Sequence, residues 1–166
     1  MVTAFRLSVS DLSGWAGPTD SEKDRRRRPR PIGSFGARLN LEGLTILVVE
    51  DHDDSRDMLR QLVESFGAKV AIARNGYEAL ATALLRKPDL VLCDLVMPGM
   101  DGFGFVHRVR SQLTLENVPV IAVSALGSDA DFRRTFEAGF DGHLVKPITY
   151  PTMAAQLERV FPGHRS

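Results

Sequence analysis

The sequence predicts an α/β fold in which five short parallel strands alternate with five helices. Short apolar runs, rich in β-branched residues, alternate five times with helical patterns over about 120 residues. The runs lack the polar alternation of a half-exposed strand, so we expect strands buried on both faces of one sheet. Strands joined by helical crossovers favour a doubly wound parallel sheet, with right-handed connections and helices on both faces.

The predicted elements follow one another in strict alternation. Strands are expected at Thr45–Val49, Lys69–Ala73, Leu90–Asp94, Val118–Ser124 and His143–Val145. The first helix is predicted from apolar residues at helical spacing, which are Met58, Leu59, Leu62, Val63 and Phe66. The remaining helices are expected at Tyr77–Leu85, Phe103–Val109, Asp129–Ala138 and Tyr150–Val160.

Residues at the helix ends support these boundaries. Asp53 or Asp54 is the expected cap at the start of the first helix, because a short acidic side chain can accept the free N–H groups there. Gly67 and Gly139 are expected to end the first and fourth helices. Thr149 is the expected cap of the fifth helix.

Charge is distributed unevenly along the chain. Residues 1–40 hold eight basic and four acidic residues, a net charge of +4, and the remaining 13 basic and 17 acidic residues give −4. We predict a disordered basic tail over residues 1–40, followed by an acidic domain over residues 41–166. The run Arg25–Arg28, continued by Arg30, could attract nucleic acid or anionic lipid, although a solvated tail is the more ordinary interpretation.

Composition narrows the class of protein. The single cysteine, Cys93, allows no disulfide within the chain, which suits a reducing compartment. No apolar run is long enough to cross a bilayer, and the first residues do not have the pattern of a signal peptide. We therefore expect a cytoplasmic protein with no membrane span.

Polar side chains follow four of the five predicted strands. Glu50 and Asp51 follow the first strand, Asp94 ends the third, Ser124 ends the fourth, and Lys146 follows the fifth. In an open parallel sheet, ligands bind beyond the carboxyl ends of the strands, so these side chains should converge. Each residue alone has an ordinary structural interpretation, such as a helix entrance, a turn or a surface amine. Their joint arrival at one edge favours a functional site.

The carboxylates of this edge predict a magnesium site. A group of unpaired carboxylates repels itself and needs a cation, and Mg²⁺ prefers oxygen ligands. Asp51 and Asp94 are the expected direct ligands, Glu50 is expected to act through water, and the backbone carbonyl of Val96 is a further candidate. Zinc is disfavoured because the four histidines lack ligand spacing and Cys93 has no partner.

Four segments carry a resemblance to a known family, and they are Ile46–Asp51, Pro88–Gly102, Val120–Ala125 and Leu144–Pro147. Together they resemble the receiver (CheY-like) domain of two-component response regulators, over residues 44–160. The acidic pair, the Asp-x-x-Met-Pro-x-Met-Asp-Gly pattern and the Lys-Pro pair occur in the family's order. The resemblance implies a flavodoxin-like sheet with its five strands in the order 2-1-3-4-5.

The resemblance also implies a role for each residue. Asp94 would accept a phosphoryl group from the phosphohistidine of a histidine kinase or a histidine phosphotransfer protein. Lys146 would pair with Asp94 before transfer and bind a phosphoryl oxygen afterwards, aimed by a cis peptide bond to Pro147. Ser124 would move inward to bond the phosphoryl group, and the backbone N–H of Ala125 would add a further donor. By this resemblance, the chain would be a phosphorylation switch that catalyses only its own phosphoryl transfer and dephosphorylation.

One position departs from the family's pattern. His143 stands where the family usually has a Tyr or Phe that couples the active-site hydroxyl to the outer face, which puts this coupling in question. We expect a receiver that stands alone or is a fragment of a larger protein, with output through protein–protein contacts or a homodimer. The expected surface combines the fourth helix, fifth strand and fifth helix, with candidates Arg133, Arg134, Glu137, His143 and Gln156.

Three other functions are compatible with parts of the pattern. A haloacid dehalogenase-type phosphatase also uses an Asp nucleophile beside magnesium, but it needs a second Asp where this chain has Val96. A nucleic-acid-binding regulator would use the arginine-rich tail and show steep salt dependence. A receiver that is never phosphorylated and acts only as a docking module fits less well with an intact acidic cluster.

Overall fold

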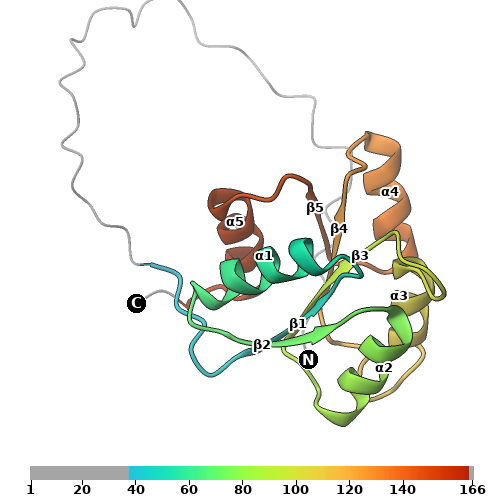
Figure 1. The fold of residues 1–166 in the computed structure, drawn as a ribbon, viewed down its shortest axis with the longest axis horizontal. Coiled ribbons are helices and arrows are strands. Elements are labelled where there is room, and N and C mark those ends of the chain that lie inside the picture. Colours follow the sequence, from blue (N-terminus) through green and yellow to red (C-terminus); the bar gives the residue numbers. More distant parts are fainter. Residues whose placement is uncertain (1–37, 165–166) are drawn as a thin grey trace, which may run out of the picture. The chain divides into compact units, whose positions relative to one another are not determined.

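Strands and helices alternate five times in the computed structural model of the chain, which describes residues 38–164 (Figure 1). The arginine run of residues 25–30 lies outside the described residues. The strands are β1 Thr45–Val49, β2 Lys69–Ala73, β3 Leu90–Asp94, β4 Val120–Ser124 and β5 Gly142–Val145. They form a parallel sheet in the order β2-β1-β3-β4-β5, as predicted.

The helices lie on both faces of this sheet. They are α1 Asp53–Glu64, α2 Gly76–Leu85, α3 Gly102–Arg110, α4 Asp129–Ala138 and α5 Tyr150–Val160. One apolar cluster joins the sheet to α1 and α5, and a second joins the opposite face to α2 and α3 (Figure 1). The interiors of β1, β3 and β4 are buried because residues of both clusters alternate along them, which is the doubly wound arrangement expected from the sequence. The edge strand β2 differs from this expectation, since only Ala73 in it is fully buried.

Most predicted boundaries are confirmed, and one cap prediction is wrong. The side chain of Thr149 caps α5, and Gly139 ends α4 with a φ of 108°. Neither Asp53 nor Asp54 is the cap of α1, because His52 occupies that position without a side-chain cap bond. The two aspartates lie in the first helical turn instead, where their charge favours the helix dipole.

Small differences also occur at the ends of two strands and two other helices. β4 begins two residues later than predicted, at Val120, because Val118 donates its N–H to a preceding turn and Pro119 has no N–H. β5, α2 and α3 each begin one residue earlier than predicted, and α3 ends one residue later. None of these differences changes which residues stand at the carboxyl ends of the strands.

A single arginine links the end of α3 to the loops on either side of β4 and α4. Arg110 donates to the carbonyl oxygens of Gly139, Val118 and Glu116 at 2.8–3.0 Å. Its guanidinium also forms a 2.8 Å ion pair with Asp141. These carbonyl groups lie in loops, outside the hydrogen bonds of the helices and the sheet. Arg110 therefore supplies the N–H donors that they would otherwise lack.

Replacing Arg110 with alanine is therefore expected to lower the free energy of unfolding by about 2–4 kcal/mol. The loss leaves several carbonyl oxygens without a donor, and urea denaturation measures it. Arg108→Ala is the matched control, since the one side-chain contact of Arg108 within residues 38–164 is its guanidinium over the Tyr77 ring, 5.9 Å from the ring centre. The control should lower the free energy of unfolding by about 1 kcal/mol or less. An equal loss in both variants would contradict the stabilising role of the Arg110 hydrogen bonds.

Candidate functional site

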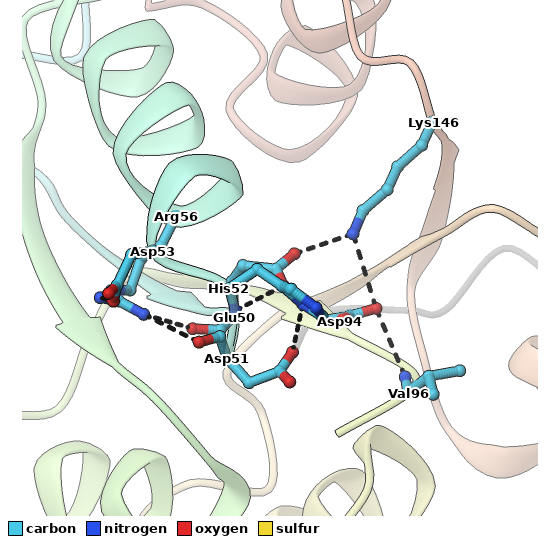
Figure 2. Close-up of polar contacts among 8 residues, drawn as sticks. All are labelled: Glu50, Asp51, His52, Asp53, Arg56, Asp94, Val96 and Lys146. Carbon is cyan, nitrogen blue, oxygen red and sulfur yellow. Dashed lines mark hydrogen bonds and ion pairs between the residues drawn. The ribbon is translucent and has the colours of Figure 1, made fainter. Parts of the chain in front are cut away.

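The strand register places four polar segments at one edge of the sheet. Val49 pairs with Cys93, so Glu50 and Asp94, which follow them, lie side by side at the carboxyl ends of β1 and β3. Ser124 pairs with Val145, so Lys146 directly follows the end of the sheet at β5. Figure 2 shows Lys146 extending from the end of β5 toward Glu50 and Asp94. The predicted convergence of side chains from β1, β3 and β5 is therefore present.

Lys146 is the charged contact that joins these elements. Its Nζ lies 2.8 Å from Oε2 of Glu50 and 3.9 Å from Oδ1 of Asp94 (Figure 2). The peptide bond from Lys146 to Pro147 is cis. The resemblance implied a pair between Lys146 and Asp94, and the structure adds that Glu50 is the closer partner.

Asp94 is almost completely buried, with 6% of its surface exposed. Its carboxylate accepts the N–H of Val96 at 3.3 Å. Burial raises the pKa of Asp94, and the charge of Glu50 raises it further, whereas Lys146 and the Val96 N–H lower it. A carboxylate that is destabilised in this way is poised to interact with a cation or an electrophile.

The β1–α1 loop brings two more acids and a histidine to the edge. Glu50 is fully buried and accepts the N–H of His52 at 3.2 Å. The exposed Nδ1 of His52 lies 3.1 Å from Oδ1 of Asp51, and the charge of Asp51 raises the pKa of His52. Ligand atoms of Glu50, Asp51 and His52 lie within 4.8 Å of one another, so this group could hold a metal ion.

Arg56 is a site neighbour that the sequence interpretation missed. Its guanidinium donates to the carbonyl oxygens of Glu50 at 3.0 Å and Asp51 at 3.4 Å, and it pairs with the carboxylate of Asp53 (Figure 2). The signal was present, because position 56 lies three residues before Leu59, on the buried face of α1. Arginine side chains are usually exposed to solvent, so the residue type gave no indication that Arg56 is buried.

A chain of hydrogen bonds runs from β4 to α4. Oγ of the buried Ser124 accepts the N–H of Leu126 at 3.0 Å. Nε2 of His143 lies 3.0 Å from the carbonyl oxygen of Leu126, and its Nδ1 lies 3.1 Å from Oγ1 of Thr135. His143 is 5% exposed and packs against the Phe132 ring at 4.7 Å. The imidazole thus connects β5 to both the β4–α4 loop and α4.

The buried position of His143 predicts an acid-sensitive contribution to stability. Burial lowers the pKa of His143 below its ordinary value of 6.5, so the unfolded chain binds this proton more readily than the folded one. The neutral imidazole contributes its full stability above pH 6.5, the ordinary pKa of the unfolded chain. This contribution is lost as the pH falls from 6.5 through the lower pKa of the folded chain.

Substituting His143 with phenylalanine is expected to reduce this pH dependence. Urea denaturation of both proteins at about pH 7.5 and about pH 5.5 measures the difference. Other titrating groups are common to both chains, so they cancel in the comparison. Equal losses of stability on acidification would show that His143 does not contribute.

The predicted output surface is mixed in character. Arg133, Arg134 and Glu137 are exposed on α4, and the guanidinium of Arg134 lies 4.5 Å from the centre of the Phe103 ring. Gln156 on α5 is half-buried, and its amide donates to the carbonyl oxygen of His143 at 3.3 Å.

Comparison with known proteins decides the family. Residues 46–158 match the family described as response regulator receiver domain. The chain belongs to this family. Receiver domains are phosphorylation switches of two-component signalling, they generally bind Mg²⁺, and response regulators interact with histidine kinases and downstream targets.

Curated relatives place this receiver domain among response regulators of different lengths. It is 33% identical to the polar-differentiation response regulator DivK of Brucella anthropi, over 64% of this chain and 87% of that protein. It is 34% identical to the phosphate regulon transcriptional regulatory protein PhoB of Pseudomonas aeruginosa, over 71% of this chain and 52% of that protein. The chain thus spans about half of PhoB's length.

Solved structures share the fold of this receiver domain. The Vibrio cholerae chemotaxis protein CheY4 matches with a TM-score of 0.67 and 32% identity, over 70% of this chain and 98% of that one. The receiver domain of a sensor histidine kinase from Pseudomonas aeruginosa, with a magnesium ion in its active-site cleft, matches with a TM-score of 0.66 and 28% identity, over 70% of this chain and 96% of that one. None of the helices that the structure describes has the length and hydrophobicity needed to cross a membrane.

Proposed function

We propose that this receiver domain accepts a phosphoryl group on Asp94 from the phosphohistidine of a histidine kinase or a histidine phosphotransfer protein. The observation that carries the proposal is the position of Lys146, whose Nζ reaches both Glu50 and Asp94 from the end of β5. A buried carboxylate beside a lysine ammonium can attack phosphorus while the ammonium binds the charge of the transferring group.

The acids of the β1–α1 loop are suited to hold Mg²⁺ beside this acceptor. Asp51 and Asp94 are the proposed direct ligands, with the carbonyl oxygen of Val96 as a further one. Glu50 is fully buried and bonded to Lys146, which supports a role at longer range, through water. When bound, Mg²⁺ supplies positive charge against the transferring phosphoryl group. The magnesium-bound Pseudomonas receiver is a structural precedent for such a site.

The chemical step needs one nucleophile and two groups that bind the product. An oxygen of Asp94 forms a bond to phosphorus while the phosphorus–nitrogen bond of the donor breaks, and the departing imidazole takes up a proton from solvent. The ammonium of Lys146, 3.9 Å from Asp94, turns toward a phosphoryl oxygen. Ser124 donates its hydroxyl, and the N–H of Ala125 is the proposed further donor.

Movement of Ser124 gives the signal a route to the surface. To bond the phosphoryl group, Oγ of Ser124 releases the N–H of Leu126, whose carbonyl is bonded to His143. His143 is bonded to Thr135 on α4, so a shift of the loop is passed to the α4-β5-α5 face. We propose that a downstream protein or a second copy of the chain contacts this face, with Arg133, Arg134, Glu137 and Gln156 among the contacting residues.

Phosphorylation by a small-molecule phosphodonor tests the proposal. The purified chain is incubated with the donor and Mg²⁺, and its intact mass is measured. We expect the mass to increase by one phosphoryl group in the presence of Mg²⁺ and to stay unchanged when EDTA replaces Mg²⁺. No gain under any donor concentration, or a gain that is independent of Mg²⁺, would contradict the proposal.

A further inference from the structure

Arg56 is a buried cation beneath the loop that carries the acidic residues of the site. It lies on the first turns of α1, and its backbone N–H donates to the carbonyl oxygen of His52 at 2.9 Å. The side chain is only 6% exposed. Figure 2 shows it folded back toward the loop, where its Nη1 lies against the carbonyl oxygens of Glu50 and Asp51.

Burial of this guanidinium is expensive. Removing a charged group from water costs several kcal/mol by a typical estimate, and a buried donor without a partner adds about 1–3 kcal/mol. Nε of Arg56 is such a donor, since it has no hydrogen-bond partner among the described residues. An apolar residue at this position of α1, level with Leu59 and Val63, would avoid both costs.

The contacts of Arg56 indicate what offsets this cost. The two carbonyl groups that it binds belong to the consecutive residues Glu50 and Asp51, and their peptide groups set the direction of both carboxylates. The exposed carboxylate of Asp53 pairs with the same guanidinium and fixes it from the other side. One cation thus binds two consecutive carbonyl groups of the loop and one carboxylate in the first turn of α1.

We propose that Arg56 is a positioning residue for the divalent cation of the site, and this inference rests on the function proposed above. By fixing the carbonyl groups of Glu50 and Asp51, it holds the Asp51 carboxylate in the direction that the cation requires. Mg²⁺ demands near-ideal octahedral geometry, so a freely moving ligand loop binds it poorly. Groups that orient metal ligands typically change metal affinity by about 10–100-fold when they are removed.

Charge and geometry make opposite predictions for this residue. As a nearby positive charge, Arg56 repels a cation, so its removal would strengthen Mg²⁺ binding if electrostatics dominated. As a clamp, it orders the ligand loop, so its removal would weaken binding. Arg56→Lys keeps the charge but loses the forked guanidinium, whose Nη1 binds the carbonyl oxygens of Glu50 and Asp51 while its Nη2 binds Asp53. Arg56→Met loses both the charge and the fork.

Calorimetric titration of the chain with MgCl₂ provides a readout that needs no phosphorylation. We expect the dissociation constant for Mg²⁺ to rise by about 10-fold in Arg56→Lys and by at least as much in Arg56→Met. Arg60→Lys is the matched control, one turn further along α1, where the partners of Arg60 among the described residues are Glu64 and Asp57. The control should bind Mg²⁺ as the wild type does.

A kinetic measurement separates positioning from general damage to the fold. In Arg56→Lys, the Mg²⁺ concentration for half-maximal phosphorylation by the small phosphodonor should rise about 10-fold. The rate at saturating Mg²⁺ should stay within about threefold of the wild type, because the acceptor and Lys146 are unchanged. A partly unfolded variant would instead lose amplitude at every Mg²⁺ concentration.

A second variant keeps the inference testable if replacing Arg56 prevents folding. Asp53→Asn removes the outer partner of the guanidinium at an exposed position and should raise the dissociation constant by about 3-fold. Asp54→Asn removes the same charge from the same helical turn, where Asp54 has no bond or ion pair among the described residues. Asp54→Asn should therefore have the smaller effect.

The outcomes distinguish the two proposals. If the wild type binds Mg²⁺ and Arg56→Lys binds it within about twofold, or Arg56→Met binds it more tightly, Arg56 does not position the site. Equal effects of Asp53→Asn and Asp54→Asn would overturn it as well. If the wild type itself binds no Mg²⁺, the proposed function fails first.

Discussion

Asp94→Asn is expected to abolish phosphoryl incorporation completely. The amide has neither the charge nor the nucleophilic oxygen needed to form an acyl phosphate. The variant should remain folded, because burial and the charge of Glu50 already raise the pKa of Asp94 and oppose its ionised form. A neutral amide of the same shape relieves this repulsion, so we expect unchanged or higher stability in urea. Intact mass after incubation with phosphodonor and Mg²⁺ measures the loss.

Asp57→Asn is the matched control for this substitution. Asp57 lies on the exposed side of α1, and its side-chain partner in the described part of the chain is Arg60, so its replacement should leave incorporation at the wild-type level. Residual incorporation in Asp94→Asn would place the acceptor on another residue. Loss in both variants would indicate an effect of charge rather than of the nucleophile.

Lys146→Gln is expected to affect both catalysis and stability. Loss of a charged group at the transferring phosphoryl typically slows such reactions by about 10²–10³-fold, which mass measurement at timed intervals would detect. The substitution also leaves the fully buried Glu50 without its 2.8 Å partner. Because the lysine is itself partly exposed, we expect a loss of about 1–3 kcal/mol rather than that of a fully buried pair.

The double variant Glu50→Gln with Lys146→Gln separates the two effects. Removing both charges eliminates the uncompensated carboxylate, so stability in urea should recover toward that of the wild type. Phosphoryl transfer should not recover, because no ammonium is available for the phosphoryl oxygens. Full recovery of the rate would show that Lys146 acts only by pairing with Glu50.

The fold and the main site were accessible from the sequence because both depend on local patterns. Five buried runs are readable from their apolar, β-branched composition, and polar residues directly after them mark one edge of a parallel sheet. Asp94 and Lys146 lie far apart in the chain, yet each ends or follows a strand, so topology alone brings them together.

What the sequence could not determine depends on contacts between side chains and backbone. The choice of Glu50 as the nearer partner of Lys146 depends on rotamers and on the turn into α1. His52 takes the cap position that acidic residues were expected to fill, since the chain enters α1 one residue earlier than the cap preference suggested. Arg56 occupies a buried position that its charge disguises, because only three-dimensional neighbours reveal the carbonyl groups it binds.

Direct localisation of the phosphoryl group tests the assignment of Asp94 as the acceptor. Borohydride reduction of the phosphorylated chain converts an aspartyl phosphate to homoserine, and peptide mass spectrometry then identifies the position. We expect homoserine at position 94 and at no other aspartate, with none formed in chain kept in EDTA. A phosphoryl group found on His52 or on a different carboxylate, with residue 94 unmodified, would contradict the assignment of Asp94 as the acceptor.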